Sequence, residues 1–594
     1  MASGAGVQMI VGERRATAAV QAVLVALVAL VVPRLFLGVD LGDESYYLAF
    51  ADEWLKRGLG GADSLAVHQS AAFLVYSAAA VFRWITGGVD GLILLYRFVF
   101  LATWIVATLS LFAFVRRVLP RLAAFGAAAT FFLFLPFGLP APSYNTLFVA
   151  FTTIAVSQLG LAAASRRSEA ASGVAFALAA VAYPPFLPVA AGFAVVAGGL
   201  WLARRNCMGR VFALCFAATL VGTVLAMVGL LGRGKLGHVF EFTLAIADPQ
   251  HNVLFKASQA WTILRSAPGF VAALALAFAS GLVLVLARDV RVRLAALAAS
   301  AAAMMYLAVG GTVLFAGGHD LVLFLVVLGS ALAVANGWLW RSSARISGFG
   351  RTAGSPPRSA LPAALLLPFA ACVLAGAVMG VASNNGLVNF PVGAAAAAAL
   401  AVGAVVALAL GSDHARLRAA GLAWLVIVAA STTYHTLSTV YGEDAQRWPA
   451  KWELVRDGVF AGLFTSPAQH RYLGEVSAAL ARAKKSGPDG RRSVAVFGRM
   501  CGLYLLGDLS PRALTTWELF DGQGQAARDM VRAYWESNPP DVILRYADPW
   551  TAPLQMFQQD LLSSSYEKSE ELDVEYRHVE VWLRRPARRS ASAQ

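Results

Sequence analysis

Long apolar stretches constrain the fold of this chain more than any other feature of its sequence. The 594 residues are 58% hydrophobic and only 14% charged, with a mean hydropathy of +0.64, which is typical of a protein that crosses a membrane many times. A helix needs about 20 apolar residues to cross the bilayer. On that rule the sequence predicts thirteen spans, near residues 17–38, 93–115, 122–140, 145–164, 169–184, 186–203, 210–232, 267–287, 293–316, 320–340, 361–382, 388–410 and 419–440.

One further apolar segment, from His68 to Trp84, is about as long as a span and decides the orientation of those that follow. If it crossed the membrane, Arg116 and Arg117 would lie outside. If it lies on the surface, the 19 Arg residues of the seven short basic clusters next to the spans all fall on one side, which the positive-inside rule identifies as the cytoplasm. The sequence therefore predicts a juxtamembrane surface helix and a cytoplasmic N-terminus. The Ala-, Val- and Leu-rich spans, with Arg favoured over Lys, indicate a bacterial inner membrane.

The composition changes abruptly after residue 440, which divides the chain into two predicted domains. Residues 1–440 form a membrane domain whose first outer loop, residues 39–92, carries juxtamembrane helices. Residues 441–594 lie outside the membrane. The predicted fold is a polytopic α-helical membrane protein with a C-terminal extracytoplasmic α/β domain. In that domain we expect strands at 494–497, 542–544 and 579–583 and helices at about 467–485, 523–537 and 553–563.

The net charge of +14 does not indicate a nucleic-acid partner. From residue 441 onward, 20 Lys and Arg balance 20 Asp and Glu, so the whole excess lies around the spans, where positive charge sets topology. The four cysteines are scattered without a CxxC pair, and the eight histidines lack a spacing such as HExxH. We therefore expect neither a disulfide framework nor a thiolate or histidine metal centre.

A short acidic run, Gly42-Asp43-Glu44-Ser45-Tyr46-Tyr47, follows the first span. Seven of the 14 Asp and Glu residues up to residue 440 lie in this first outer loop. Carboxylates at a membrane surface lose solvation and repel one another, so the run indicates chemistry or a bound cation. Asp43 and Glu44 are the catalytic candidates. The alternative is that they cap the following helix, because acidic side chains stabilise the first turn of a helix.

The order of these features resembles the GT-C glycosyltransferases, in the branch that contains the protein O-mannosyltransferases and the lipid A aminoarabinose transferase. The shared features are one N-terminal span, Asp-Glu with two tyrosines, a surface helix and a second span bounded by Arg. The resemblance covers residues 15–440 in topology. In sequence it is limited to Gly42–Tyr47, His68–Arg97 and Pro142-Ser143-Tyr144-Asn145-Thr146.

The resemblance implies an enzyme that transfers a hexose or pentose from a polyprenyl-phosphate donor to an envelope lipid, glycan or protein on the outer face of the membrane. It also implies inversion at the anomeric carbon, with Asp43 as the base. Glu44 would orient Asp43, hold a hydroxyl group or share a cation. Tyr46 and Tyr47 would contact substrate, although they fit an interfacial aromatic belt at least as well.

The leaving phosphate needs positive charge or hydrogen-bond donors. Much of the family has a Lys-Pro-Pro-Leu-like segment at the start of the surface helix, where this chain has His68-Gln69-Ser70. His68 and Gln69 would bind the phosphate or simply begin the helix. Arg97 pairs either with the phosphate or with a loop carboxylate such as Asp90, and the sequence favours neither. Arg265 and Lys256 in the second outer loop are weaker candidates.

A second departure concerns the next outer loop, where many relatives carry an acid and this chain has Tyr144-Asn145. Asn cannot act as a base and is a poorer cation ligand, so a metal bridged by two carboxylates is in doubt and the need for Mg²⁺ or Mn²⁺ stays open. Asn145 hydrogen-bonds the sugar or acceptor, with Tyr144 beside it, or else it caps a helix after Pro142.

Two other functions fit the same pattern. A transporter or flippase for lipid-linked substrates would need ionisable residues within the spans, and almost none occur there. A catalytically inactive relative that serves as an assembly subunit would explain the missing second acid and the missing Lys-Pro-Pro segment. The sugar, the acceptor and the length of the polyprenyl chain leave no signal in the sequence.

Overall fold

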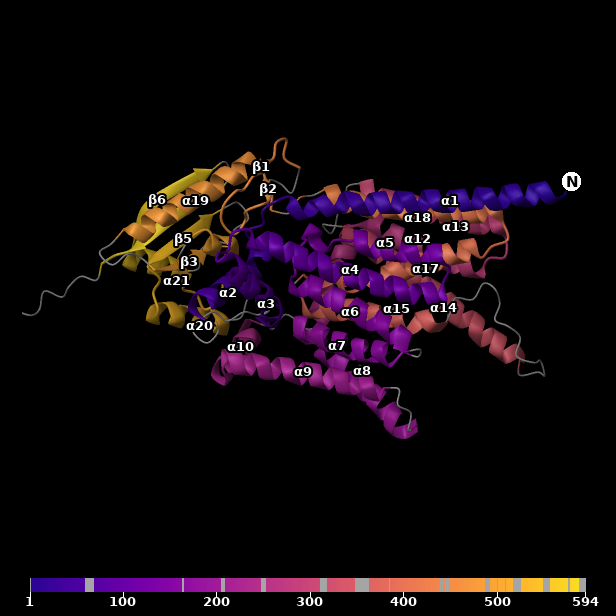
Figure 1. Ribbon diagram of the computed structural model, residues 1–594, viewed down its shortest axis with the longest axis horizontal. Helices are drawn as coiled ribbons and strands as arrows, with labels where there is room; N and C mark the ends of the chain where they lie inside the picture. Colours follow the sequence, from indigo (N-terminus) through magenta and orange to yellow (C-terminus); the bar gives the residue numbers. More distant parts are fainter. Residues whose placement is uncertain are drawn as a thin grey trace, which may run out of the picture.

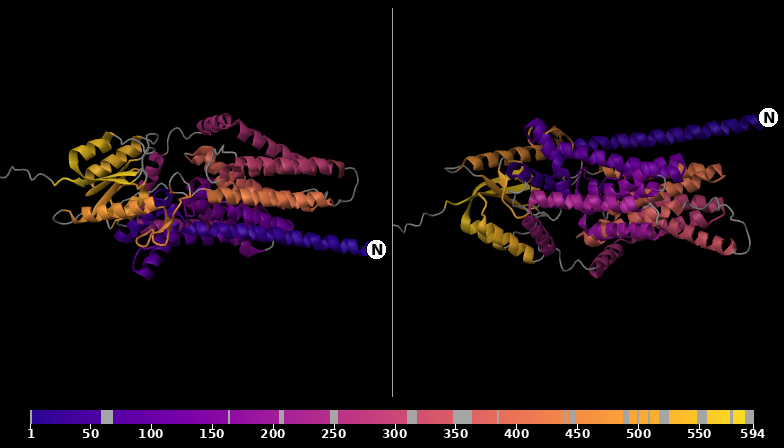
Figure 2. Two further views of the ribbon diagram at one scale, coloured as in Figure 1. Left: turned by 90° about the horizontal axis from the view of Figure 1, so that it is seen from above. Right: turned by 60° about the horizontal axis from the view of Figure 1, so that its bottom comes forward.

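The computed structural model describes residues 2–58, 69–162, 165–204, 209–246, 253–309, 318–347, 363–383, 385–438, 440, 442–443, 448–486, 492–498, 500–507, 509–516, 525–547, 556–574 and 577–586. A bundle of long helices makes up most of the molecule, and a smaller domain that contains a β-sheet sits at one end of it (Figure 1). The N-terminus lies at the opposite end of the bundle, as the two further views also show (Figure 2).

A helix occupies each of the thirteen positions predicted to span the membrane. Nine helices in the described part of the chain are long and apolar enough to cross a membrane, and ten if the bent pair α16 and α17 is one span. Helices α5, α7 and α15, with 13, 17 and 17 residues, are shorter. The helices are α1 (Ala2–Val31), α4 (Leu92–Val118), α5 (Arg121–Leu133), α6 (Tyr144–Leu161), α7 (Arg166–Ala182), α8 (Leu187–Arg204), α9 (Arg210–Leu231), α12 (Pro268–Leu286), α13 (Val290–Val309), α14 (His319–Ser347), α15 (Leu366–Ala382), α16 (Phe390–Gly393) with α17 (Ala395–Leu410), and α18 (Ala415–Ser438).

Breaks in the helices follow from local chemistry. Helix α7 ends at Ala182, and the turn Pro184–Phe186 separates it from α8, because proline lacks the N–H that an interior helical position needs. The prediction of two short helices at this point, rather than one long kinked helix, is confirmed.

Four shorter helices lie in the two loops that the sequence predicts to be on the outer side. They are α2 (Asp43–Arg57), α3 (Gln69–Thr86), α10 (Arg233–Ile246) and α11 (Val253–Ser266). Helices α2 and α3 lie at the end of the bundle that faces the sheet domain (Figure 1). Helix α3 covers the segment predicted to be a surface helix and is not among the helices long enough to cross a membrane.

The C-terminal domain is built on a five-stranded sheet in the order β4-β3-β5-β7-β6. Strand β3 is parallel to β4 and β5, whereas β7 is antiparallel to both β5 and β6. The expected strands and helices are all present. The elements are β3 (Ser493–Phe497), β4 (Ser510–Pro511), β5 (Val542–Ala547), β6 (Tyr566–Val574), β7 (Arg577–Arg584), α19 (Pro467–Lys485), α20 (Gln525–Ser537) and α21 (Met556–Ser565), with a separate pair β1 (Glu453–Leu454) and β2 (Phe464–Thr465).

Strand β6 is the main element that the sequence did not predict. It forms the edge of the sheet, and most of its residues between Glu567 and Glu571 are exposed and charged. Charges are common on edge strands because they discourage pairing with other chains. Such a strand lacks the apolar alternation from which strands are predicted.

Candidate active site

The acidic run begins with a residue that fixes the start of α2. The carboxylate of Asp40 accepts hydrogen bonds from the backbone N–H groups of Gly42 (2.8 Å) and Glu44 (2.7 Å), and its carbonyl oxygen accepts one from the Ser45 hydroxyl (2.5 Å). The first N–H groups of a helix have no partner within the helix, so a carboxylate placed there caps it. Asp40 is therefore the cap of α2.

Burial makes Asp40 unusual for an aspartate. Loss of solvation and repulsion from Asp43 raise the pKa of Asp40 to about 7, although its two bonds from backbone N–H groups oppose the rise. The residue therefore changes charge close to neutral pH, three positions before the catalytic candidate.

Glu44 is committed to Arg97, which lies on α4. The guanidinium group binds the carboxylate through two hydrogen bonds of 2.6 Å each, from Nε and Nη2, and the side chains are 2% and 1% exposed. Nη1 also donates to the carbonyl oxygens of Leu35 (2.9 Å) and Leu37 (3.1 Å), and Nη2 to that of Gly38 (2.8 Å). All five N–H groups of Arg97 thus have acceptors.

This pairing corrects two expectations from the sequence. Arg97 has no N–H left for a phosphate, and its partner is Glu44 rather than Asp90. Glu44 in turn binds Arg97 through both carboxylate oxygens and is 1% exposed, so it is held in the protein interior. We reassign both residues as a buried pair that holds the loop between the first span and α2.

A second buried arginine, Arg34, was not singled out in the sequence. It donates to the carbonyl oxygens of Thr436 (3.4 Å), Leu37 (3.3 Å) and Gly138 (3.2 Å). Gly138 lies about 100 positions and Thr436 about 400 positions from Arg34 in the chain. Arg34 therefore ties the end of the first span to the outer ends of α5 and α18.

Asp43 is the first residue of α2 and is only partly buried. Its charge acts on the hydroxyl groups of Tyr47 and Tyr144, so the three side chains are close neighbours. The Tyr47 hydroxyl accepts a hydrogen bond from the backbone N–H of Tyr144 (3.1 Å), which joins α2 to the start of α6. Burial raises the pKa of the Tyr47 hydroxyl well above its usual value, so it stays protonated.

The aromatic residues around Asp43 are of two kinds: some pack in the core, and others lie at the candidate site. Tyr46 is fully buried and packs edge-on against Tyr47 (5.2 Å between ring centroids) and Phe50 (4.9 Å). This placement fits packing better than contact with a substrate or the membrane interface. Tyr144 instead stacks on Tyr183, with ring centroids 5.7 Å apart and planes inclined by 16°.

Asn145 is not the cap of α6. Ser143 holds that position: its hydroxyl accepts from the backbone N–H of Thr146 (3.3 Å), and the Thr146 hydroxyl accepts from the backbone N–H of Ser143 (2.8 Å). This reciprocal pair is a capping box. Asn145 therefore lies inside the first turn, where its side chain is free of a capping role.

Asn389 joins this group from the far end of the membrane domain. The hydroxyl group of Tyr144 lies beside the amide groups of both Asn145 and Asn389. Asn389 follows the turn Gly386–Val388, which comes after α15. The Asn389 amide reaches the site through its proximity to Tyr144, which is 245 positions away in the chain.

His319 fixes the turn that carries Asn389. Its Nε2 accepts a hydrogen bond from the backbone N–H of Phe137 (3.3 Å), so the ring proton must sit on Nδ1, which donates to the carbonyl oxygen of Val388 (3.0 Å). Phe137 has a φ of +57°, which a residue other than glycine seldom adopts. Such strain persists where the surroundings impose it, and it clusters at functional sites.

The remaining candidates lie in different settings. Gln69 begins α3, and His68 falls outside the described residues. Arg265 is exposed in the last turn of α11. Lys256, on the same helix, is buried, and its stem lies against Gly386 in the turn before Asn389. Lys256 is therefore better placed than Arg265 to act near the site.

The C-terminal domain holds the backbone just before Asp43. The carboxylate of Glu443 accepts from the backbone N–H groups of Val39 (3.3 Å) and Ser466 (3.1 Å), and Gln469 donates to the carbonyl oxygen of Val39 (3.4 Å). Phe464 accepts from the N–H of Gly38 (2.8 Å). The two domains therefore share the segment that leads to the catalytic candidate.

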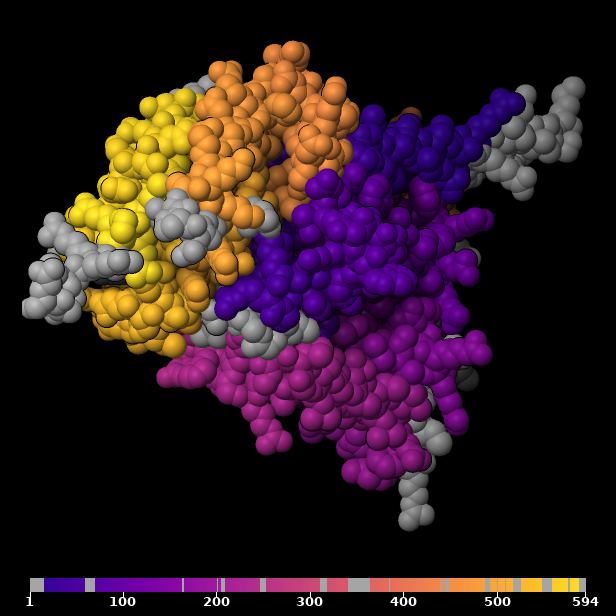
Figure 3. Space-filling model, turned by 60° about the vertical axis from the view of Figure 1, so that its left-hand side comes forward, coloured from indigo at the N-terminus to yellow at the C-terminus, as the bar shows by residue number. Residues whose placement is uncertain are grey.

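A second contact follows two residues later. The N–H of Gly502 donates to the carbonyl oxygen of Leu41 (2.6 Å), and a Cβ atom at position 502 would come within 2.6 Å of the Leu41 side chain. Glycine is required by this close approach. The space-filling view shows the C-terminal residues, in orange and yellow, packed against the indigo segment of the first loop (Figure 3).

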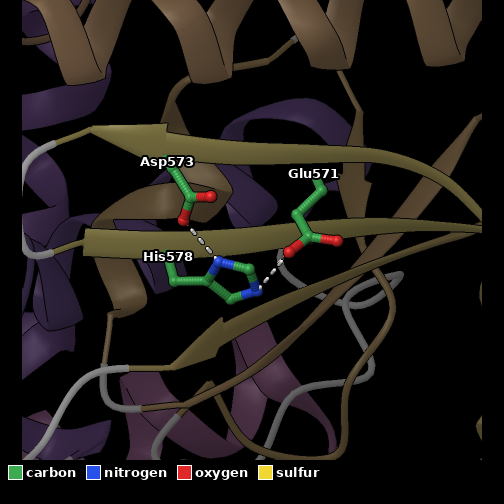
Figure 4. A group of neighbouring side chains, drawn as sticks. All are labelled: Glu571, Asp573 and His578. Carbon is green, nitrogen blue, oxygen red and sulfur yellow. Dashed lines mark hydrogen bonds and ion pairs between the residues drawn. The ribbon is translucent and has the colours of Figure 1, made fainter.

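Two other features of the C-terminal domain lie away from Asp43. A cavity of about 640 Å³ is lined by residues 453–460, α19 and the turn Cys501–Leu505, on the C-terminal domain rather than beside Asp43. Glu571, Asp573 and His578 cluster on the β6–β7 hairpin (Figure 4). There Nδ1 of His578 bonds Asp573 (2.6 Å), and Lys568 competes for Glu571 (2.5 Å), so the group is already internally paired.

No protein-family model matches the chain, and no curated protein matches it in sequence. Among solved structures it is similar to ArnT from Cupriavidus metallidurans, bound to undecaprenyl phosphate, with 13% identity, a TM-score of 0.40, and coverage of 94% of this chain and 97% of that one. It is also similar to the Archaeoglobus fulgidus oligosaccharyltransferase tethered to an acceptor peptide, with 14% identity, a TM-score of 0.43, and coverage of 89% and 69%. Both are GT-C glycosyltransferases, the superfamily that the sequence resembles. At these identities and TM-scores, neither the reaction nor the substrates carry over.

Proposed function

We propose that this chain is a membrane glycosyltransferase that moves a sugar from a polyprenyl-phosphate donor to an acceptor on an envelope lipid, glycan or protein. The transfer takes place at the outer end of the helical bundle, beside the C-terminal domain. Asp43 acts as the base that takes the proton of the acceptor as it attacks the anomeric carbon.

One observation carries the assignment of Asp43. Of the three acids in the run, Asp40 caps α2 and Glu44 is bound to Arg97, whereas Asp43 is partly exposed beside two buried tyrosine hydroxyl groups. A base must reach its substrate, and only Asp43 among these three has both accessibility and a site-facing position. Inversion follows if the acceptor attacks opposite the leaving phosphate.

The leaving phosphate requires a positive charge, because negative charge grows on it as the bond to the sugar breaks. All N–H groups of Arg97 are bound within the protein, and Arg265 is exposed. We propose Lys256 for this role, because it is buried next to Gly386 and belongs to the second outer loop. Its flexible stem can present the ammonium group as a point charge.

The described residues around Asp43 do not fit a cation bridged by two carboxylates. Both oxygens of Asp40 accept backbone N–H groups, both oxygens of Glu44 accept from Arg97, and position 145 is Asn. These bonds disfavour a bridging cation, and we propose that the transfer uses none. A chelator such as EDTA should leave the rate of the purified protein unchanged within about twofold, and a rate restored only by Mg²⁺ or Mn²⁺ would contradict this.

The test begins with mass spectrometry of lipid-linked sugars and envelope glycans in cells that carry wild type, Asp43→Asn or Asp90→Asn. Asp90 is an exposed acid in the same outer loop and serves as the matched control. We expect Asp43→Asn to accumulate one polyprenyl-phosphate sugar and to lose one glycan. Near-normal glycans with Asp43→Asn would exclude the proposed base.

The donor identified in this way then separates a transferase from a transporter. Purified wild type, incubated with that donor and an envelope extract, should release polyprenyl phosphate and attach the sugar to an acceptor. Asp43→Asn should reduce the rate by at least about 100-fold, since a general base contributes roughly 10²–10⁴-fold. A transporter or an assembly subunit would leave the bond between sugar and phosphate intact.

A further inference from the structure

Two amide oxygens near Asp43 are buried without a hydrogen-bond partner among the described residues. They are Oδ1 of Asn145, whose residue is 8% exposed, and Oδ1 of Asn389, which is fully buried. Leaving a buried acceptor unpaired is costly, so such groups in a folded protein have a reason to be there. A bound ligand that supplies hydrogen-bond donors is one such reason.

Both amides are held in place by other parts of the chain. The amide nitrogen of Asn389 donates to the Ser383 hydroxyl (2.5 Å), which holds this amide in place, and Oδ1 has no partner among the described residues. The bond between His319 and Val388 fixes the backbone just before it. Asn145 is fixed by the capping box at the start of α6. The two acceptors are therefore pre-positioned, as a binding site requires.

The amides flank an aromatic platform next to the proposed base. The Tyr144 hydroxyl lies beside both amides and within reach of the charge on Asp43. Its ring stacks on Tyr183, whose own hydroxyl is buried and has no hydrogen-bond partner in the part of the chain that the structure describes. Rings with one apolar face and a polar edge suit a ligand that has both apolar C–H groups and hydroxyl groups.

We propose that Asn145 and Asn389 form the subsite for the donor sugar, with each Oδ1 accepting a hydrogen bond from a ring hydroxyl of a sugar that carries no anionic group. This inference rests on the proposed transferase function. A phosphate or a sugar carboxylate offers acceptors rather than donors, so either would leave the two amide oxygens unpaired. The subsite therefore selects the sugar and not its phosphate.

The experiment measures two constants with purified protein: KM for the polyprenyl-phosphate sugar, and Ki for polyprenyl phosphate that carries no sugar. Asn145→Ala and Asn389→Ala should each raise KM about tenfold, which corresponds to a hydrogen bond of ~1.4 kcal/mol. Ki should stay within about twofold of wild type. Asn385→Ala, in the same turn as Asn389 but exposed, is the matched control and should change neither constant.

A donor that lacks one ring hydroxyl adds a second readout. Wild type should bind the correct deoxy donor about tenfold more weakly, whereas the variant at the matching asparagine should not distinguish it from the complete donor. If an alanine variant at 389 does not fold, as shown by its thermal unfolding midpoint, Asn145→Ala carries the test, because its amide is not bonded to Ser383.

The outcomes separate this inference from the proposed function. Wild type that releases no polyprenyl phosphate defeats the proposed function. Active wild type with unchanged KM in both variants, or with KM and Ki raised equally, overturns the sugar subsite, because an equal rise would mean that the amides support the whole site rather than the sugar.

Discussion

Two groups of neighbouring acids in the described part of the chain differ in almost every respect. At the start of α2, Asp40 and Glu44 are buried, and their partners include Arg97, 53 positions away from Glu44. On the β6–β7 hairpin, Glu571 and Asp573 are exposed, and they pair with residues of the same hairpin, Lys568 and His578. Both groups look alike in the sequence as short acidic runs.

The comparison shows that a buried acid depends on its own set of hydrogen-bond donors, whereas an exposed acid does not. In low-dielectric surroundings a carboxylate must be bonded to specific donors, so Asp40 and Glu44 cannot exchange roles. On the hairpin, water screens the charges, and any acid can serve any nearby cation. Substitutions should therefore have large and distinct effects at the first group, and small and similar effects at the second.

The largest effect is expected where one member of the buried pair is removed. Arg97→Leu leaves Glu44 buried without its cation, which should reduce the free energy of unfolding by about 3–5 kcal/mol. The thermal unfolding midpoint and the yield of monodisperse protein in detergent would measure this. Replacing both residues by leucine should recover part of the loss. An Arg97→Leu protein as stable as wild type would show that the pair does not hold the loop.

The next effect concerns the contact between the domains. Glu443→Ala leaves the N–H of Val39 without its acceptor, which should cost about 1–3 kcal/mol of stability. The rate of transfer should fall further, by roughly tenfold or more, because the backbone before Asp43 is released and small misplacements of a reacting group are costly. Glu567→Ala, at an exposed position of β6, is the control and should change neither quantity. Equal rates for both variants would contradict the role of Glu443.

A smaller effect should appear in the pH dependence of stability. The pKa of Asp40 is raised to about 7 in the folded protein, so the folded state binds a proton that the unfolded state releases near pH 4. Its stabilising contribution is fully present below about pH 4 and is lost as the pH rises through about 7. Unfolding midpoints of wild type should therefore fall between pH 5 and pH 8, and Asp40→Asn should flatten that slope. A slope unchanged in the variant would assign it to another group.

The smallest effect is expected at the hairpin. The hydrogen bond that the His578 ring donates to Asp573, followed by the nearby acids, raises the pKa of His578, so its contribution to stability is present below about pH 6.5 and is lost at higher pH. Because the group is largely solvent-exposed, His578→Ala should change stability by only about 0.2–1 kcal/mol at pH 6, and by less in high salt. A Zn²⁺-dependent rise in the unfolding midpoint of wild type, absent in the variant, would instead identify the cluster as a cation site.

The course of the helices was largely predictable because membrane spans are encoded locally. A run of apolar residues and its flanking arginines carry enough information to place α1, α4 and α9. The buried strands β3 and β5 were found for the same reason. Strand β6 was not, since its position at the sheet edge allows charges that look like a surface loop.

The site was predictable only where its residues lie within one segment. Asp43 could be selected from the acidic run, but the sequence gives no sign that Glu44 is bound to Arg97. Asn389 and Glu443 were missed because their partners lie hundreds of positions away. The residues next to Asn389 and Glu443 in the sequence give no indication of these long-range contacts.

The bonds from Glu443 and Gln469 to Val39 also determine when the site can form. They join residues separated by 404 and 430 positions, so the segment before Asp43 lacks these bonds until Gln469 has been synthesised. Contacts of such long range form late in folding. We therefore expect the proposed site to assemble only after this part of the C-terminal domain has been made.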